Sequence, residues 1–156
     1  MTEESKKIVI DSVEFEYVNS KEKTLDLLKR FDCVFPHLKQ KISSYEDYAE
    51  KLFRYANVCV CLYDGNICGL LVYYANDIET KVSYISLIGV LSEWQGKKIG
   101  KMMLDHCVAR CKINGMLRLQ LEVDIDNYNA IEFYKRNGFV VIGNKSATSM
   151  NMMKEL

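Results

Sequence analysis

The sequence carries almost no proline, one residue in 156, and no net charge, since 21 Lys and Arg balance 21 Asp and Glu. A balanced charge gives no overall attraction to nucleic acid or to an anionic membrane, so we predict neither as a partner. Apolar residues make up 49% of the chain and charged residues 27%, a composition that excludes a disordered chain. Its length and the absence of a linker predict one domain over residues 1–156.

Long hydrophobic runs are also missing from the sequence. No apolar run approaches the roughly 20 residues that a membrane-spanning helix needs. The opening segment, residues 1–10, is charged and lacks the apolar centre of a signal peptide. We therefore predict a cytoplasmic protein.

The sequence has six cysteines but no Cys-x-x-Cys pair, and a domain of this size can bury a core without disulfides. Cys107 and Cys111 lie on one face of a predicted helix. A metal site there would need His106, which points off that face, and a second pair of ligands, which the pattern does not supply. We predict no metal and reduced structural thiols at Cys33, Cys59, Cys61, Cys68, Cys107 and Cys111.

Hydrophobic periodicity predicts seven strands and four helices. Apolar alternation and short apolar runs favour strands over 13–17, 58–63, 67–75, 81–91, 117–123, 139–142 and 148–153. Helical spacing favours helices after Ser20, after Ser44, over 97–114 and from Asp126 or Asn127 to Gly138. The order of these elements predicts a mixed α/β sandwich of sheet and helices.

The segment after the strand that ends near Leu91 has the features of a phosphate site. It is a turn with glycine that opens a helix, and the first turn of a helix has unpaired N–H groups and a partial positive charge. Gly96 and Gly100 would let the backbone approach a ligand closely, and three lysines add positive charge. These lysines are Lys97, Lys98 and Lys101.

Two common phosphate motifs are excluded here. The ATP-binding loop needs four residues between its glycines and a Ser or Thr after the lysine, whereas Gly96 and Gly100 enclose three and Met102 follows Lys101. No hydroxyl is therefore placed to hold magnesium. The dinucleotide fingerprint Gly-x-Gly-x-x-Gly is absent as well.

The segment instead resembles motif A of the GNAT superfamily of N-acetyltransferases, Arg/Gln-x-x-Gly-x-Gly/Ala. Gln95 takes the first position and Gly100 the last, and Lys98 stands where the pattern has its middle glycine. A later segment is similar to a second motif of the family, Asn-x-x-Ala-x-x-x-Tyr-x-x-x-Gly-Phe. It matches at Asn127, Ala130, Tyr134, Gly138 and Phe139, and the resemblance covers roughly residues 58–153.

This resemblance implies an α+β fold with a mixed, mostly antiparallel central sheet flanked by helices. It also implies an acetyl-CoA-dependent N-acetyltransferase that moves the acetyl group to a primary amine by direct transfer, without a metal. Tyr134 takes the family's general-acid position, and a backbone N–H near residues 88–90, where Gly89 would break the sheet, polarises the thioester. The implied cofactor-binding residues are Ile88, Val90, Gln95, Gly96, Lys97, Lys98, Gly100, Lys101 and Asn127.

The acceptor side carries fewer signals. Many relatives use a glutamate on the strand before motif A as base, but residues 84–90 contain no carboxylate. A water chain near Tyr84 or Ser86, or an amine that loses its proton in solvent, are both open. We predict a small-molecule amine acceptor, with a protein or peptide acceptor as the alternative. The expected walls are the connection 33–43, with Pro36 and His37, together with Tyr73, Tyr74 and Tyr84.

Simpler interpretations stand beside these. Residues 95–101 would otherwise be a helix start with a solvated basic face, Tyr134 a core tyrosine, and Asn127 a helix cap. The chain as a whole would otherwise be a non-catalytic acyl-CoA sensor or a peptide-binding domain on the same fold. As to assembly, we predict a monomer or a homodimer.

Overall fold

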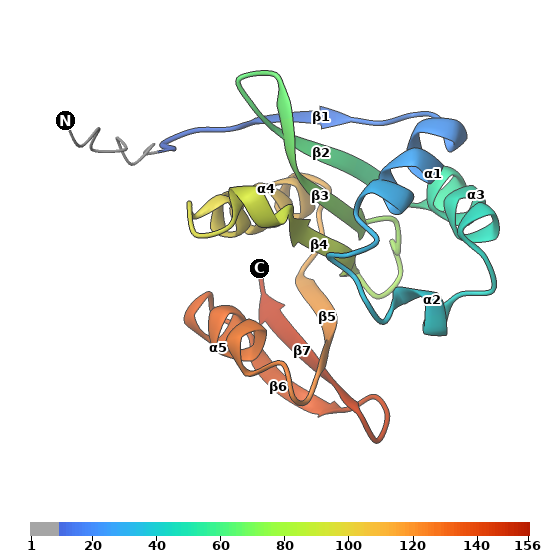
Figure 1. Cartoon of the computed structure of the whole chain (residues 1–156). Helices are drawn as coiled ribbons and strands as arrows, with labels where there is room; N and C mark the ends of the chain where they lie inside the picture. Colours follow the sequence, from blue (N-terminus) through green and yellow to red (C-terminus); the bar gives the residue numbers. More distant parts are fainter. Residues whose placement is uncertain (1–9) are drawn as a thin grey trace.

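The computed structural model describes residues 10–156, which form a seven-stranded sheet in the order β1-β2-β3-β4-β5-β7-β6 (Figure 1). Every neighbouring pair is antiparallel except β4 and β5, which are parallel. The strands are β1 (Glu14–Tyr17), β2 (Asn57–Tyr63), β3 (Asn66–Tyr74), β4 (Val82–Val90), β5 (Arg118–Asp124), β6 (Val140–Asn144) and β7 (Ser149–Glu155).

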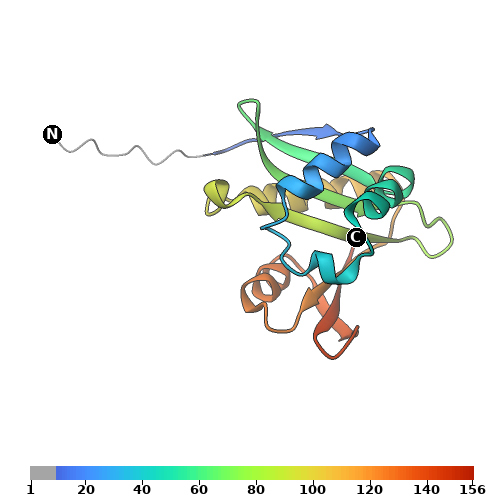
Figure 2. The ribbon, with the colours of Figure 1, turned by 45° about the vertical axis from the view of Figure 1, so that its right-hand side comes forward.

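Helices cover both faces of the sheet. Along β3, Leu70 and Val72 belong to one apolar cluster while Leu71 and Tyr73 belong to another, because successive side chains of a strand point to opposite faces. Figure 2 shows α1 and α3 on the near side of the strands and α4 on the far side. The helices are α1 (Lys21–Arg30), α2 (Leu38–Lys41), α3 (Tyr45–Tyr55), α4 (Ile99–Ile113) and α5 (Tyr128–Arg136), with a 3-10 turn η1 (Ser92–Trp94).

The predicted fold class is confirmed, since the sheet is mixed and mostly antiparallel and helices flank it. The predicted order of elements is also found. Two short elements, α2 and η1, were not predicted, because a single helical turn shows no hydrophobic period. The six cysteines are free, and all but Cys33 are buried. Within residues 10–156, no helix is long and apolar enough to span a membrane.

Side chains cap three of the longer helices at their N-termini. Ser20 for α1, Ser44 for α3 and Asn127 for α5 each accept a hydrogen bond from the backbone N–H three residues ahead. Such a bond satisfies one of the N–H groups that the first turn leaves unpaired. Helix α4 has no such cap, although it is the longest helix of the described residues.

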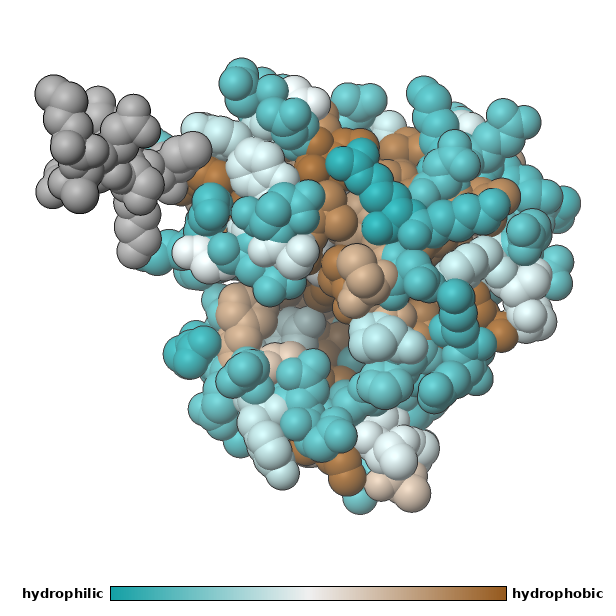
Figure 3. Space-filling model, in the orientation of Figure 1, coloured by the Kyte–Doolittle hydropathy of each residue, from teal (hydrophilic) through white to brown (hydrophobic). Residues whose placement is uncertain are grey.

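The sheet splits between β4 and β5. The two strands pair only over residues 82–85 and 118–121, after which β4 continues beside β3 and β5 beside β7. The split begins at Ser86, which is left unpaired by a bulge where the partners of β3 jump from Ile85 to Leu87. Figure 3 shows a hollow between the part of the surface that holds β1 to β4 and the part that holds α5, β6 and β7, with hydrophobic residues inside it.

The prediction that Gly89 breaks the sheet is wrong. Gly89 is paired with Leu70 in regular register. A Cβ at Gly89 would come within 2.5 Å of Val34 and 2.7 Å of Phe35, so the glycine instead lets the connection after α1 pack onto the sheet. The bulge at Ser86 provides the break.

Candidate active site

The start of α4 is open to a ligand. The first helical hydrogen bond runs from the N–H of Met102 to the carbonyl of Lys98, so the N–H groups of Ile99, Gly100 and Lys101 have no partner inside the helix. No side chain caps them, in contrast to α1, α3 and α5. The N-terminus of α4 therefore presents unpaired N–H donors and the positive end of the helix dipole.

A cavity of about 550 Å³, here called the α4 cavity, lies over this helix start. It contains six of the predicted cofactor residues, namely Val90, Gln95, Gly96, Lys98, Gly100 and Lys101. Lys97 does not line it. Sequence reasoning missed three lining residues that α5 and its end bring in from a distant part of the chain, which are Phe133, Arg136 and Asn137.

Some charged and polar side chains that line the α4 cavity are held by hydrogen bonds or ion pairs within the protein, and others are not. The amide of Gln95 donates to the carbonyl of Val90 at 3.1 Å, which ties the turn to β4. The ammonium of Lys101 is 3.2 Å from both Asp105 and the side-chain oxygen of Asn137. Lys98 and Arg136 form no ion pair within residues 10–156, so their charges are free to meet an anion.

Two residues explain the motif in conformational terms. Lys98 has a φ of +62°, the left-handed region in which glycine is favoured, which accounts for the glycine of the family pattern at this position. At Gly100, an added Cβ would meet only Phe133, at 3.9 Å. The backbone of Gly100 is therefore exposed to the α4 cavity.

A second cavity, of about 230 Å³, lies where β4 and β5 separate and is called here the split cavity. The predicted residues Ile88, Asn127 and Tyr134 all line it. Its wall consists of Val34, Phe35, Lys41, Ile85, Ser86, Leu87, Ile88, Leu121, Glu122, Val123, Asp124, Asn127, Ala130 and Tyr134. Strand β4 links the two cavities, since Val90 lines the α4 cavity and Ile88 the split cavity.

Strand β4 turns free backbone donors toward the split. The N–H of Leu91 donates to the carbonyl of Cys68 on β3 at 2.9 Å. Because backbone groups alternate along a strand, the N–H groups of Ile88 and Val90 point away from β3, toward the side that β5 has left. These two donors can bind an oxygen that carries developing negative charge.

Tyr134 is 9% exposed, and its ring packs edge-on against Phe133 and Phe139 with centroids 5.4 and 5.5 Å away. Its hydroxyl forms no hydrogen bond within residues 10–156, although the side chain lines the split cavity. Burial, helped by the neighbouring Cys107, raises the pKa of Tyr134 to about 12. The phenol is therefore a protonated, unpartnered donor at the cavity wall.

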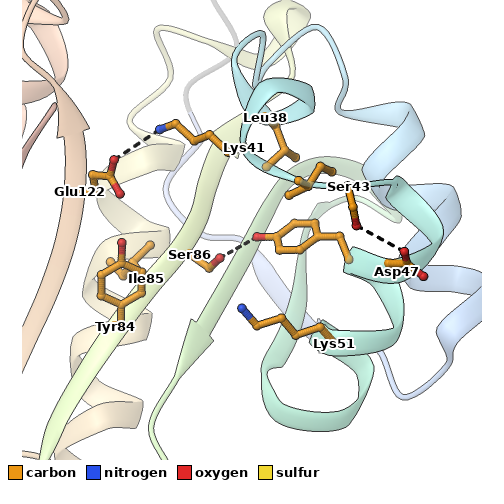
Figure 4. Close-up of a pocket in the computed structure, with 11 residues that line it drawn as sticks. Leu38, Lys41, Ser43, Asp47, Lys51, Tyr84, Ile85, Ser86 and Glu122 are labelled. Atoms are coloured by element: carbon orange, nitrogen blue, oxygen red, sulfur yellow. Dashed lines mark hydrogen bonds and ion pairs between the residues drawn. The ribbon is translucent and has the colours of Figure 1, made fainter. Parts of the chain in front are cut away.

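On the other face of the sheet, α2, α3, β4 and β5 enclose a groove of about 520 Å³, called here the α2 groove (Figure 4). The hydroxyls of Tyr48 and Ser86 are hydrogen bonded across it at 2.7 Å. Burial and the nearby carboxylate of Glu122 raise the pKa of Tyr84 to about 12. The lining residues are Leu38, Lys41, Ile42, Ser43, Asp47, Tyr48, Lys51, Tyr84, Ile85, Ser86 and Glu122.

The α2 groove continues into a further pocket of about 480 Å³, which shares Leu38, Lys41 and Ser86 with it. The predicted residues Pro36 and His37 line this second pocket. Together the two form an extended opening along α2 that leads to the split cavity.

Of the three tyrosines predicted for this wall, Tyr84 lines the α2 groove and Tyr73 does not. The prediction for Tyr73 is wrong, because Tyr73 alternates regularly with Leu71 along β3 and so faces α4, where it is 1% exposed and its hydroxyl lies 2.8 Å from that of Tyr17. The hydroxyl of Tyr74 is buried and has no hydrogen-bond partner among residues 10–156, and Tyr74 does not line the groove.

Sequence reasoning missed Tyr48 and Glu122. Apolar Leu119, Leu121 and Val123 alternate along β5 and place Glu122 on the opposite face, which the sequence could indicate. That this face meets Ser86 follows only from the parallel pairing of β4 with β5. Within residues 10–156, no three His, Cys, Asp or Glu side chains are grouped so that they could hold a metal ion.

Comparison with known proteins supplies a family for this arrangement. Residues 24–139 match the model of the acetyltransferase (GNAT) family. N-alpha-acetyltransferase 50 of Danio rerio is 30% identical over 124 residues, which are 76% of this chain and 70% of that protein. An uncharacterized N-acetyltransferase of Methanocaldococcus jannaschii is 31% identical over 84 residues, 51% of this chain and 37% of that protein.

A solved structure has the same fold. The PaiA N-acetyltransferase of Thermoplasma acidophilum, in complex with coenzyme A, superposes with a TM-score of 0.72 at 21% identity. The match covers 93% of this chain and 99% of that one.

Proposed function

The chain belongs to the GNAT family of acetyltransferases, and on that premise we propose that it transfers the acetyl group of acetyl-CoA directly to the α-amine at the N-terminus of a polypeptide. Membership confirms the resemblance drawn from the two sequence motifs. Membership in a family of acetyltransferases supports an enzyme over the alternatives of a non-catalytic sensor and of a peptide-binding domain.

One observation carries this proposal. Three features follow one another along β4 and into its split. They are the uncapped start of α4, the free N–H groups of Val90 and Ile88, and the unpartnered hydroxyl of Tyr134. A cofactor with phosphates at one end and a thioester at the other needs these three features in this order. Lys98 and Arg136 would hold the phosphates, which are anionic, and Asn127 stands at the opposite wall of the split cavity.

Different groups that line the split would carry out different parts of the reaction. The N–H groups of Ile88 and Val90 would polarise the carbonyl that the amine attacks. Residues 84–90 of β4 contain no carboxylate. The carboxylate of Glu122 would therefore take the proton of the acceptor's ammonium. This assigns the base that the sequence left open.

Tyr134 would act on the leaving sulfur. Full proton transfer from a phenol with a pKa of about 12 to a thiolate with a reference pKa near 8.5 is uphill by roughly 5 kcal/mol. A hydrogen bond from the hydroxyl to the developing thiolate avoids most of that cost, and solvent then supplies the proton. Tyr134 thereby stabilises charge that forms only in the transition state.

The shape and charge of the acceptor side favour an N-terminal amine. The α2 groove and its neighbouring pocket are open and continuous, so an extended chain has room beyond its first residue. An α-amine, with a reference pKa near 8, also gives up its proton more readily than a lysine side chain with a reference pKa near 10.4. The relative from Danio rerio bears the name of an N-alpha-acetyltransferase.

A small amine is the second candidate. The carboxylates of Asp47 and Glu122 line the α2 groove, and Asp124 lies beside Glu122. A compact acceptor with a second ammonium group would find partners for both charges there. This is the acceptor class that the sequence predicted.

An acceptor panel at saturating acetyl-CoA tests the proposal. The panel pairs peptides that have a free N-terminus with the same peptides blocked at the N-terminus and carrying one lysine, and adds amino sugars and diamines. We expect turnover on the free N-termini. Activity confined to the small amines would contradict the N-terminal acceptor, and no activity with any amine would contradict acetyl transfer by this site.

Glu122→Gln tests the base within the same panel. Loss of a general base lowers the rate by about 10²–10⁴-fold. The defect should shrink as the pH rises through about 8, where an α-amine loses its proton in solvent. Asp124→Asn removes a carboxylate on the same face of β5 and is the matched control. An equal defect at every pH would show that Glu122 does not take the proton.

A further inference from the structure

Lys41 reaches from α2 across the α2 groove to β5. Its ammonium nitrogen lies 3.6 Å from a carboxylate oxygen of Glu122 and 3.9 Å from one of Asp124. Figure 4 shows the side chain extended toward Glu122, with a dashed line between the two groups. The side chain is half exposed, so it is held by these two ion pairs rather than buried.

Lys41 also belongs to the cavity in which the transfer takes place. It lines the split cavity together with Ile88, Glu122 and Tyr134. Among the residues that line this cavity, all of them within residues 10–156, Lys41 alone carries an amine. A primary amine therefore rests on the carboxylate assigned as base, at the place that an incoming acceptor must occupy.

We propose that Lys41 is an internal acceptor, and that each molecule acetylates its own Lys41 when no external amine is present. This inference rests on the proposed function, because it uses the same carboxylate, the same donors and acetyl-CoA. Glu122 takes a proton from the ammonium of Lys41. The neutral nitrogen attacks the thioester carbonyl carbon, a C–N bond forms, and the C–S bond breaks with its electron pair leaving on sulfur as the thiolate of CoA. The acylated nitrogen then releases its second proton to solvent and becomes the amide, the thiolate takes up a proton from solvent, and Glu122 returns its proton to solvent.

The product changes the charge of the site. An acetylated Lys41 is neutral, so both ion pairs with Glu122 and Asp124 are lost, and the base is freed for an external amine. Before acetylation, an external ammonium group must displace Lys41 from Glu122. External acceptor and Lys41 therefore compete for one carboxylate, and the acceptor should protect Lys41 from acetylation.

Neighbouring lysines supply matched controls. Lys51 lines the α2 groove but not the split cavity. Lys39 lies on α2 with Lys41, but its ammonium is 3.4 Å from Asp32, and it lines neither of these two cavities. If proximity to the split cavity decides the reaction, Lys41 should be acetylated well before Lys39 and Lys51.

The experiment incubates the full chain with acetyl-CoA alone and measures acetylation of each lysine by peptide mass spectrometry over time. We expect Lys41 to be modified about 10²-fold faster than Lys39 or Lys51, because it is held beside the base. The rate constant should not depend on protein concentration, as for a reaction within one molecule. Equal labelling of the three lysines, or a rate constant proportional to protein concentration, would overturn the proposal.

Variants and a parallel assay separate this inference from the proposed function. Lys41→Arg keeps the positive charge but cannot be acetylated in this way, so the label at position 41 should vanish without spreading to Lys39. Tyr134→Phe should slow labelling of Lys41, whereas chemical acetylation by free acetyl-CoA would be unaffected. Turnover of an external amine without labelling of Lys41 overturns only the internal acceptor. Absence of both reactions overturns the proposed function with it.

Discussion

The two sides of the split are built in different ways. On the cofactor side, the end of β4, the turn η1 and the start of α4 form one continuous segment, and Arg136 adds a charge from α5. On the acceptor side, the groups come from four elements, α2, α3, β4 and β5, which are far apart in the sequence. The cofactor side offers backbone N–H groups and basic side chains, whereas the acceptor side offers hydroxyls, carboxylates and Lys41.

The proposed function accounts for this difference by what each side would bind. Phosphates are anions that backbone donors at a helix start can hold, so that site tolerates a change of side chain such as Lys98 in place of glycine. An amine must give up a proton, which requires a carboxylate at one place. A single substitution on the acceptor side, at Glu122 or Lys41, should therefore change activity and selectivity more than most substitutions on the cofactor side.

The largest expected effect lies at the point where the two sides meet. Tyr134→Phe removes the hydroxyl that faces the split cavity but keeps the ring and its packing against Phe133 and Phe139. We expect turnover to fall by about 10²–10³-fold, as for the loss of one donor that stabilises charge in the transition state, with little change in acetyl-CoA affinity. Steady-state kinetics and calorimetric titration of acetyl-CoA measure the two quantities separately.

Tyr128→Phe is the matched control, because Tyr128 lies on the same helix with its side chain 73% exposed. It should turn over acceptor at the wild-type rate. If Tyr134→Phe did so too, Tyr134 would be a core tyrosine and the chemistry would not lie between the two sides.

A smaller effect is expected for the cofactor side alone. Gly100→Glu places a side chain and a negative charge over the free N–H groups of α4, whereas Gly100→Ala adds only a Cβ that meets Phe133 at 3.9 Å. Acetyl-CoA at 100 times its dissociation constant should stabilise the wild type by about 2.7 kcal/mol. We expect this stabilisation to disappear in Gly100→Glu and to persist in part in Gly100→Ala.

Thermal unfolding with and without acetyl-CoA measures this stabilisation in the wild type and in both Gly100 variants. A full shift in folded Gly100→Glu would place the phosphates away from α4. Because the proposed acceptor groove lies on the other face of the sheet, the affinity for acceptor peptides is the internal control for the integrity of that groove.

The cofactor side was largely predictable, because its features are local. A strand end, a turn with glycine and a helix start without a cap are written in one stretch of sequence, and six of the nine predicted cofactor residues line the α4 cavity. Ile88 and Asn127 line the split cavity instead, and Lys97 lines neither. Arg136 was missed because only the docking of α5 brings it near α4.

The acceptor side was not predictable in the same way. The bulge at Ser86 places Ile85 and Leu87 on opposite faces of the sheet, so regular alternation along β4 could not predict which of its side chains face the acceptor side. The meeting of Glu122 with Ser86 depends on parallel pairing between strands that a whole helix separates in the sequence. The connection 33–43 was predicted as a wall of this site, and Pro36, His37 and Lys41 do line it, but the single turn α2 inside it has no periodic signal.

The smallest expected effect tests whether the cofactor side holds the phosphates without a contact from the side chain of Lys98. Lys98 is a left-handed residue at the start of α4, and a side chain in that conformation costs about 1–2 kcal/mol relative to glycine. Glycine also lowers the free energy of unfolding by about 0.4–1 kcal/mol, because it gives the unfolded chain more conformational freedom. Lys98→Gly should therefore stabilise the protein without ligand by about 0.5–1 kcal/mol, which thermal unfolding resolves as a rise of about 2 °C in Tm.

Lys98→Ala separates strain from charge, because alanine keeps the unfavourable φ while the ammonium is lost. If the side chain of Lys98 meets a phosphate, both variants should bind acetyl-CoA more weakly than the wild type, and more so at low salt, where charges are less screened. If both bind as the wild type does and only Lys98→Gly is more stable, then Lys98 contributes strain and no contact. The phosphates would then be held by the free N–H groups of α4 with Arg136, and the contrast with the side-chain-built acceptor side would be sharper still. A Lys98→Gly protein no more stable than wild type would instead show that the turn before α4 relaxes around lysine, and that backbone geometry does not dominate this side.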